Sequence, residues 1–213
     1  MKQWSEFKFG ELVDFPPKIE IKKGDVYPFI GMENLNPQKR YVQNSSLRTY
    51  SSSGMAKFKV DDVIMARISP CLENGKIAQV HNLPRKSGFG STEFFVFRAA
   101  KSKIVPGYLY YLSKSDLIWK SAVNSMVGAS GRQRADAKFL KNIIVKIPDL
   151  LVQQKIAAIG TAYDDLIETN KKRIEILEKM AEELYREWFV RMRFPGYKNT
   201  KFVKGVPEEW EVK

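Results

Sequence analysis

The sequence predicts an α+β protein, in which a domain with a mixed, curved sheet is followed by one long α-helix. Up to Pro148, strand-like and helix-like segments are interspersed without the regular alternation of a doubly wound sheet. From Gln153 to Arg193, apolar residues recur every three or four positions, which is the period of a helix. The expected organisation is a domain at 1–148, a long helix within 149–196, and a final segment at 197–213.

In the first half of the domain, short apolar runs between polar stretches indicate strands. We expect a short strand or helical turn at 4–15, and a buried strand that runs into a loop at 28–35. The stretch 45–54 is rich in serine and glycine, and is predicted to be a polar surface loop. Further strands are expected at 63–68, which is apolar, and at 75–81, which alternates with period two.

In the second half of the domain, glycine and proline mark the boundaries. A glycine-containing loop that leads into a strand is expected at 88–98, and aromatic-rich helices at 106–124, where Pro106 suits the first helical turn. The segment 128–140 reads as a glycine- and arginine-containing loop followed by a short helix. A last strand is predicted at 142–147.

The long helix carries a heptad seam, in which side chains return alternately after three and four residues. The seam residues are Ile156, Ile159, Tyr163, Leu166, Asn170, Arg173, Leu177, Met180 and Leu184. Asn170 and Arg173 are polar, and a paired coil can use such positions to fix its register and partner. We therefore expect an antiparallel pair with a second helix of this kind. The alternative is a surface helix docked on its own domain.

A second apolar line runs beside the seam and widens the apolar face of the helix. It consists of Ile167, Ile174, Ala181 and Trp188, which repeat every seven residues. The helix is therefore expected to contact more than one neighbour.

The charge distribution favours a polyanion as partner. The chain has 36 Lys/Arg and 24 Asp/Glu, a net charge of +12, of which +11 lies in residues 1–150 and +1 in residues 151–213. Such an excess is typical of a nucleic-acid-binding surface, and general solubility is the alternative. No run of eighteen apolar residues is present and the N-terminus lacks a signal-peptide core, so we expect a cytoplasmic protein without a membrane partner.

Catalytic signatures are missing from the sequence. The single cysteine, Cys71, excludes an internal disulfide and a cysteine-rich zinc site, and the single histidine, His81, lies on an alternating stretch, so no metal site is expected. Neither a nucleophile elbow nor a complete P-loop is present. Asp14, Glu20 and Lys22 imitate the site of a small metal-dependent nuclease, which is one alternative function. A coiled-coil adaptor with an incidentally basic domain is another.

Three polar loops, at 67–76, 90–93 and 130–134, combine glycine with hydrogen-bond donors suited to DNA. Arginine can bridge guanine O6 and N7, and glutamine can bridge adenine N6 and N7. The Arg-Gln-Arg segment 132–134 is therefore the most specific candidate for reading bases. Its alternative is an ordinary solvated loop. The candidate DNA-contact residues are Arg48, Arg67, Ser69, Asn74, Lys76, Ser91, Thr92, Arg132, Gln133 and Arg134.

Several segments together carry a resemblance to a known family. In the domain they are PFIGMENL (28–35), ARISPCLENGK (66–76), GFGSTEFFVFR (88–98) and GASGRQRADAKFL (128–140). In and before the helix they are IPDLLVQQKIA (147–157) and LYREWFVRMRFPG (184–196). The first group resembles the target-recognition domain, and the second the helical region, of the specificity subunit of type I restriction-modification enzymes. The resemblance spans nearly the whole chain.

The resemblance implies a non-catalytic subunit that chooses the DNA sequence for separate methyltransferase and restriction subunits. S-adenosylmethionine, ATP and Mg would belong to those partners, and this chain would have no cofactor of its own. The residues expected in a homodimeric antiparallel coil are Ile159, Tyr163, Leu166, Asn170, Arg173, Leu177 and Met180. Those expected to contact the methyltransferase subunit are Tyr185, Trp188, Phe189 and Arg191.

A specificity subunit of this family has two recognition domains and two paired helices, and this sequence has one of each. The segment 205–213 echoes 4–8, with an aromatic residue, a carboxylate, an apolar residue and a lysine, so it is expected to open a second repeat. Chance similarity is the alternative. A homodimer of such half-subunits would read an inverted repeat with an unread spacer.

Overall fold

The computed structural model describes residues 4–51, 54–129 and 131–210. Ser130 of the predicted third loop, and residues 211–213 of the predicted second repeat, lie outside the described residues. The chain divides into two compact units, Met1–Asp164 and Asp165–Lys213. Within the described residues, no helix is long and apolar enough to cross a lipid bilayer.

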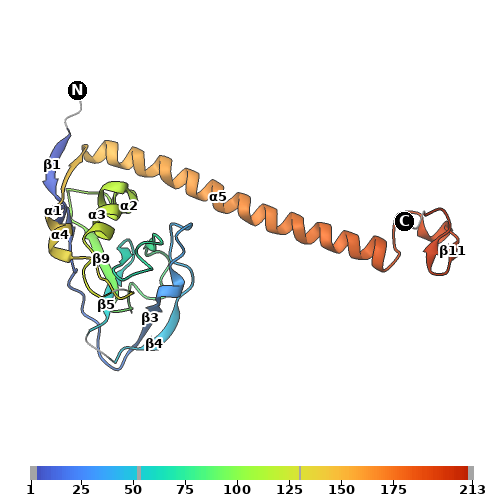
Figure 1. The fold of residues 1–213 in the computed structure, drawn as a ribbon, viewed down its shortest axis with the longest axis horizontal. Coiled ribbons are helices and arrows are strands. Elements are labelled where there is room, and N and C mark those ends of the chain that lie inside the picture. Colours follow the sequence, from blue (N-terminus) through green and yellow to red (C-terminus); the bar gives the residue numbers. More distant parts are fainter. Residues whose placement is uncertain (1–3, 52–53, 130, 211–213) are drawn as a thin grey trace. The chain divides into compact units, whose positions relative to one another are not determined.

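The first unit contains two four-stranded sheets (Figure 1). The strand order of the first sheet is β2 (Val13–Asp14), β9 (Phe94–Ala99), β6 (Val63–Ala66) and β7 (Ile77–Gln79), with all neighbours antiparallel. All four residues of β6 and the first four of β9 are buried. A short continuous apolar run is typical of a strand covered on both faces, and the strand predicted at 63–68 is confirmed.

The second sheet mixes parallel and antiparallel pairs. Its strand order is β4 (Ser46–Thr49), β3 (Val26–Ile30), β8 (Ser87–Gly90) and β5 (Ala56–Lys59), in which β3 and β8 are parallel. This pairing confirms the predicted mixed α+β class. Two local predictions are wrong. The stretch predicted as the loop 45–54 contains the edge strand β4, and the glycine-containing loop predicted at the start of 88–98 is the end of the interior strand β8.

The glycines of β8 are explained by the close approach of its neighbours. A Cβ atom at Gly88 would lie 2.7 Å from the carbonyl oxygen of Pro28 and 2.7 Å from the ring of Phe58. A Cβ atom at Gly90 would lie 2.4 Å from the carbonyl oxygen of Ile30. Glycine in a strand often marks such a close approach, and a side chain here would push β3 and β5 away.

Short helices complete the core of the first unit. They are α1 (Phe9–Leu12), α2 (Pro106–Lys114), α3 (Asp116–Asn124), α4 (Ala137–Asn142) and the 3-10 turn η1 (Met32–Asn34). β1 (Ser5–Lys8) pairs antiparallel with β10 (Ile144–Ile147). Pro106 occupies the first turn of α2, as predicted, and Asp136 caps α4 by accepting hydrogen bonds from two backbone N–H groups. The main core joins these helices to the first sheet through Phe9, Phe97, Leu109, Ile118 and Leu140.

The long helix α5 (Leu150–Tyr185) is continuous and passes into a π-helical turn, η2 (Arg186–Val190). Its first four turns lie beside α2 (Figure 1). Gln153 and Ala157 are buried there. A Cβ atom at Gly160 would lie 2.4 Å from the ring of Tyr111, so helix and ring are in close contact. The docking face of these turns is therefore made of small and polar residues.

Buried hydrogen bonds fasten the first turn of this docking face. The side-chain oxygen of Gln153 accepts a hydrogen bond from the Val105 N–H at 2.9 Å. Its amide nitrogen donates to the carbonyl oxygens of Lys103 at 3.1 Å and Pro148 at 2.9 Å. Since a buried amide needs such partners, Gln153 ties the start of α5 to Pro148, just before the helix, and to residues 103–105, just before α2.

A buried arginine fastens the later turns. Arg40 is 8% exposed and donates two hydrogen bonds to Gln79 Oε1, at 3.1 and 2.9 Å. It also donates to the hydroxyl groups of Tyr111, at 3.2 Å, and Thr161. Tyr111 in turn donates to Asp164 at 2.6 Å. Burial and the hydrogen bond to this carboxylate raise the pKa of Tyr111 to about 12, so its hydroxyl stays a donor at neutral pH.

The second unit contains the remainder of α5, the turn η3 (Tyr197–Asn199) and a ribbon of β11 (Phe202–Val203) with β12 (Val206–Pro207). Aromatic rings pack around the end of the helix. Trp210 lies 5.3 Å from Phe189 and 5.1 Å from Phe194, measured between ring centroids. We call Tyr185, Phe189, Phe194, Phe202 and Trp210 the aromatic cluster.

Candidate nucleic-acid interface

The first and third predicted loops come together next to the second. The Ser69 N–H donates to the Gln133 carbonyl at 3.0 Å, and the Ala135 N–H donates to the Arg67 carbonyl at 2.8 Å. The Arg67 N–H donates to the Glu93 carbonyl at 2.9 Å. Backbone hydrogen bonds thus join three loops that are far apart in the sequence. We call the resulting group the recognition cluster: Arg67, Ser69, Ser91, Thr92, Glu93, Arg132, Gln133 and Arg134.

Glu93 is the electrostatic centre of the recognition cluster. Its carboxylate accepts three hydrogen bonds from the Arg134 guanidinium, at 2.7 to 3.1 Å, and lies 3.7 Å from Arg67 Nε. The hydrogen bonds from Arg134 lower the pKa of Glu93, and Glu93 raises the pKa of Arg134. The carboxylate therefore orients one predicted arginine and neutralises part of the positive charge. The role of Glu93 is not visible in the sequence, because its partner Arg134 is 41 residues away.

Two donors of the cluster make no hydrogen bond with the part of the protein that the structure describes. Arg67 Nε and Ser69 Oγ are buried and make no hydrogen bond within the described residues. The Arg67 guanidinium lies over the ring of Phe95, with 5.3 Å from Cζ to the centroid. Arg132 is exposed. Buried donors normally have a partner, so these groups are suited to donate hydrogen bonds to a ligand.

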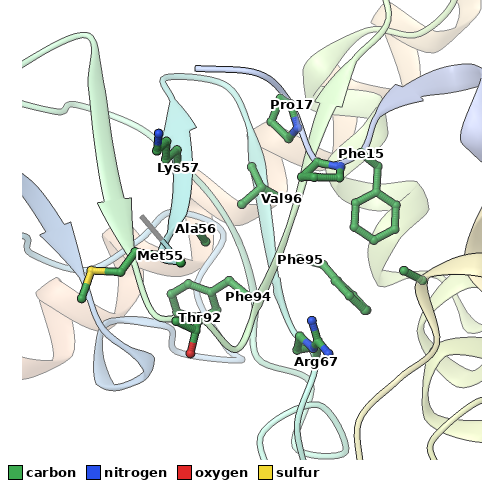
Figure 2. Close-up of a pocket in the computed structure, with 13 residues that line it drawn as sticks. Phe15, Pro17, Met55, Ala56, Lys57, Arg67, Thr92, Phe94, Phe95 and Val96 are labelled. Carbon is green, nitrogen blue, oxygen red and sulfur yellow. The ribbon is translucent and has the colours of Figure 1, made fainter. Parts of the chain in front are cut away.

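A cavity of about 410 Å³ adjoins the cluster. Figure 2 shows Arg67 and Lys57 at opposite sides of this cavity, with Phe94 and Phe95 between them. Its other lining residues are Phe15, Pro16, Pro17, Gly54, Met55, Ala56, Thr92, Val96 and Ala137. Two predicted contact residues, Arg67 and Thr92, therefore line a hollow with an apolar floor.

The other predicted DNA contacts lie outside the hydrogen bonds of the cluster. Lys76 Nζ donates to the Met32 carbonyl at 2.8 Å, and Asn74 is exposed. Arg48 is on the edge strand β4, where its guanidinium lies 3.9 Å from the centroid of the Phe29 ring. Lys76 and Arg48 thus already have protein partners. A structural contact of this kind cannot be seen from the sequence of a loop.

The arrangement offers cations and hydrogen-bond donors for recognition. Within the described residues, no group of three or more His, Cys, Asp or Glu side chains is placed to hold a metal ion. Asp14, at the end of β2, and Glu20 are exposed. The chemistry of the recognition cluster is that of a surface for a polar, anionic ligand.

Comparison with known proteins identifies the class of this fold. The crystal structure of the HsdS subunit from Thermoanaerobacter tengcongensis matches with a TM-score of 0.62 and 19% sequence identity, over 86% of this chain and 47% of that chain. The fold is thus that of a type I specificity subunit. The chain belongs to the family described as type I restriction modification DNA specificity domain, whose profile matches residues 1–179. This confirms the resemblance seen in the sequence.

Two curated relatives come from Methanocaldococcus jannaschii. The type I restriction enzyme MjaIX specificity subunit is 39% identical over 119 residues, which are 53% of this chain and 27% of the relative. The putative type I restriction enzyme MjaX specificity subunit is 28% identical over 193 residues, which are 87% of this chain and 44% of the relative. The chain spans less than half the length of these relatives.

Proposed function

We propose that this chain selects one half of a bipartite double-stranded DNA target, as the recognition part of a type I restriction-modification system. In this proposal, residues 1–148 are the recognition domain, 149–196 the pairing helix, and 197–213 a linker and the start of a second, truncated repeat. Family membership and the net charge of +11 in residues 1–150 support it. The chain itself is non-catalytic, and S-adenosylmethionine, ATP and Mg belong to the methyltransferase and restriction subunits.

The recognition cluster is the proposed reader of bases. Arg132 and Gln133 have the side chains for bidentate contacts with guanine and adenine. Arg134 is held in one orientation by Glu93, which is the preorganisation that a specific contact needs. Hydroxyl groups of Ser69, Ser91 and Thr92, and the Arg67 guanidinium, suit phosphates. The further proposed contacts are Arg48, Asn74 and Lys76.

The observation that carries the pairing part of the proposal is the exposed seam of α5. Apolar seam residues are strongly exposed along the whole helix: Ile159 60%, Tyr163 65%, Leu166 54%, Leu177 62% and Met180 62%. A lone helix gains nothing from such a row, whereas a paired coil buries it. Asn170 and Arg173 fall near the middle of the seam, where the two chains of an antiparallel homodimer would cross their two-fold axis. A polar residue in a seam can specify the register and the partner of a coil.

The end of α5 is the proposed contact for the methyltransferase subunit. Tyr185 is 61% and Phe189 45% exposed, and Trp188 is half-buried. Arg191 forms an ion pair with Glu187 on the same helical turn. Aromatic residues beside arginine are frequent anchors of protein interfaces. Because Phe189 also packs on Trp210, the proposed contact includes part of the aromatic cluster.

Sedimentation tests the pairing. Leu177→Asp should make the chain monomeric at micromolar concentration, because an unpaired carboxylate buried in the seam raises the dissociation constant by at least about a hundredfold. Lys172→Gln is the control. It lowers the net charge by the same amount, but lies on the solvent face of α5, and should leave the dimer intact. An unsubstituted chain that sediments as a monomer contradicts the homodimer.

Co-purification tests the partner and the target together. The chain is expressed with the methyltransferase subunit of its own system, and methylated sites are then mapped. We expect an inverted repeat with an unread spacer. Alanine at a base-reading position among 132–134 should cost about 1–3 kcal/mol of binding and relax one target position. If alanine variants at all three positions select sequence like the parent chain, the recognition cluster is not the reader.

Two alternatives predict different results. A coiled-coil adaptor with an incidentally basic domain predicts no salt-dependent DNA binding by the chain. A metal-dependent nuclease predicts cleavage of DNA by the chain alone with magnesium, and loss of that cleavage in Glu20→Gln.

A further inference from the structure

Several of the basic residues predicted to contact DNA already interact with other groups of the protein. Glu93 neutralises part of the charge of Arg67 and Arg134, and the Lys76 ammonium is bound to the Met32 carbonyl. Arg40 is buried in the docking network. The cations that remain available to a polyanion must therefore be sought elsewhere on the first unit.

Two adjoining hollows bring three such cations together. The cavity of Figure 2 shares Pro17 and Lys57 with a second hollow of about 680 Å³. The second hollow is lined by Pro17, Lys18, Ile19, Glu20, Lys57 and Lys59. We call the two hollows together the lysine trough; Arg67 and Thr92 line the first hollow, and Lys18 and Lys59 line the second. None of its three lysines was a candidate in the sequence.

The geometry of β5 sets the spacing of two of these lysines. β5 is an edge strand, in which Phe58 is fully buried between Lys57 and Lys59. Residues two apart on a strand point to the same side and are roughly 6.8 Å apart. This is close to the distance between successive phosphates of one DNA strand. Lys57 and Lys59 therefore project from the same side of β5.

The charges of the trough favour an anion. Within the described residues, Lys18, Lys57 and Lys59 form no ion pair, although Lys59 interacts electrostatically with Asp62, a buried carboxylate that is paired with Arg98. Glu20 lines the same hollow, so the hollow holds three ammonium groups and one carboxylate. Lys57 is half-buried, with its ammonium group 5.3 Å from the centroid of the Tyr50 ring. Lysine is a flexible point charge, and this suits sequence-independent contact with phosphates.

We propose that the lysine trough holds the sugar-phosphate backbone of one strand of the bound DNA, with Lys57 and Lys59 on successive phosphates and Lys18 beside them. This inference rests on the proposed function, since it assigns part of the same DNA to a second surface. The recognition cluster supplies contacts that depend on sequence, and the trough supplies contacts that do not.

The test measures the salt dependence of binding to a mixed-sequence duplex, for which no target needs to be known. Removing one phosphate contact lowers the slope of log Kobs against log salt by about 1. Lys57→Met and Lys59→Met should each show this loss and bind severalfold more weakly, equally on all sequences. Lys146→Met is the matched control, because Lys146 is an exposed strand lysine on β10 outside the trough. It should keep the parent slope, and all variants should melt like the parent.

The outcomes separate this inference from the proposed function. If the unsubstituted chain shows no salt-dependent binding, both fail together. If it binds and the trough variants keep its slope, the trough alone is overturned. Lysine on an edge strand can also serve to prevent edge-to-edge aggregation. Variants that aggregate while their soluble fraction keeps the parent slope assign Lys57 and Lys59 to that role and overturn the phosphate contact.

A site for free phosphate has the same chemistry and is distinguished by competition. Inorganic phosphate should displace the duplex no better than chloride at equal ionic strength, in the parent chain and in Lys57→Met alike. Preferential displacement by phosphate in the parent chain alone would assign the trough to a small anion and overturn the assignment to DNA.

Discussion

A helix on a protein surface usually docks its apolar face and exposes its polar face. The first four turns of α5 do the reverse. The face docked on the recognition domain carries Gln153, Ala157, Gly160 and Thr161, which are small or polar. The adjacent face carries Ile159 and Tyr163 and is left exposed. Hydrophobic burial alone would dock the second face. Close packing and buried hydrogen bonds select the first, so the apolar face remains free for a partner.

The largest loss of stability is expected from replacing Arg40, the buried arginine that holds the docked face of α5. Arg40→Met removes the hydrogen bonds to Gln79, Tyr111 and Thr161, and should lower the free energy of unfolding by about 3 kcal/mol, because buried groups lose a charged partner. Arg132→Met is the control, since Arg132 is exposed, and should change stability little. Both are compared by urea unfolding. Equal stability of Arg40→Met and the parent would show that apolar packing alone holds the docking face.

A smaller effect is expected from a single methyl group. Gly160→Ala places a Cβ against the ring of Tyr111, which Arg40 and Asp164 hold in place, and should destabilise the chain by about 1–3 kcal/mol. In a Tyr111→Leu background the clash is relieved, and the same change should cost less or stabilise, because alanine is a better helix former than glycine. A double-mutant cycle measures this coupling. Additive effects would contradict the close contact.

The exposed face should behave in the opposite way. In dilute solution, where the proposed dimer would dissociate, Ile159→Ala should change the free energy of unfolding by less than about 0.5 kcal/mol. At concentrations where the proposed dimer would form, the same variant should melt below the parent, because association stabilises only the folded chain. Thermal melts across a concentration series check this. A loss of stability that is independent of concentration would place Ile159 in the core of its own domain.

The smallest effect concerns a pair in the recognition cluster. The pKa of Glu93 is lowered below its ordinary value of 4.5 by hydrogen bonds from Arg134, so the ionised carboxylate stabilises the fold. This contribution is complete above the ordinary pKa and is lost as the pH falls through the lowered value. The melting temperature of Glu93→Gln should therefore lie slightly below that of the parent at pH 6, and the two should converge below pH 4.5. A constant difference between them down to pH 3 would speak against the ion pair.

Segments with a clear hydrophobic period, or with a boundary marked by proline, were predictable from the sequence. The long helix and its seam follow from a period that depends only on neighbours along the chain. The apolar strand β6 and the helix that starts at Pro106 follow from local composition in the same way. The family resemblance also rests on contiguous segments and is confirmed by the match to residues 1–179.

Features that depend on distant contacts were not predictable. β8 contains two glycines in four residues, which is typical of a loop, and only the carbonyl oxygens of β3 and the ring of Phe58 explain them. Arg40 is separated from Thr161 by 121 residues and belonged to no motif. Lys57 and Lys59 look like the solvated side of an ordinary strand until Pro17 and Lys18 are seen to line the same hollow. The candidate contact residues stay predictions until binding is measured.

The packing of Trp210 on Phe189 and Phe194 gives the second unit an optical reporter of its own. Indole emission depends on the surroundings of the ring, and here those surroundings belong to the end of α5. A chain with Trp4→Phe and Trp119→Phe would emit from Trp188 and Trp210 alone. Capture of a partner at the helix end could then be followed by fluorescence, separately from any event in the recognition domain.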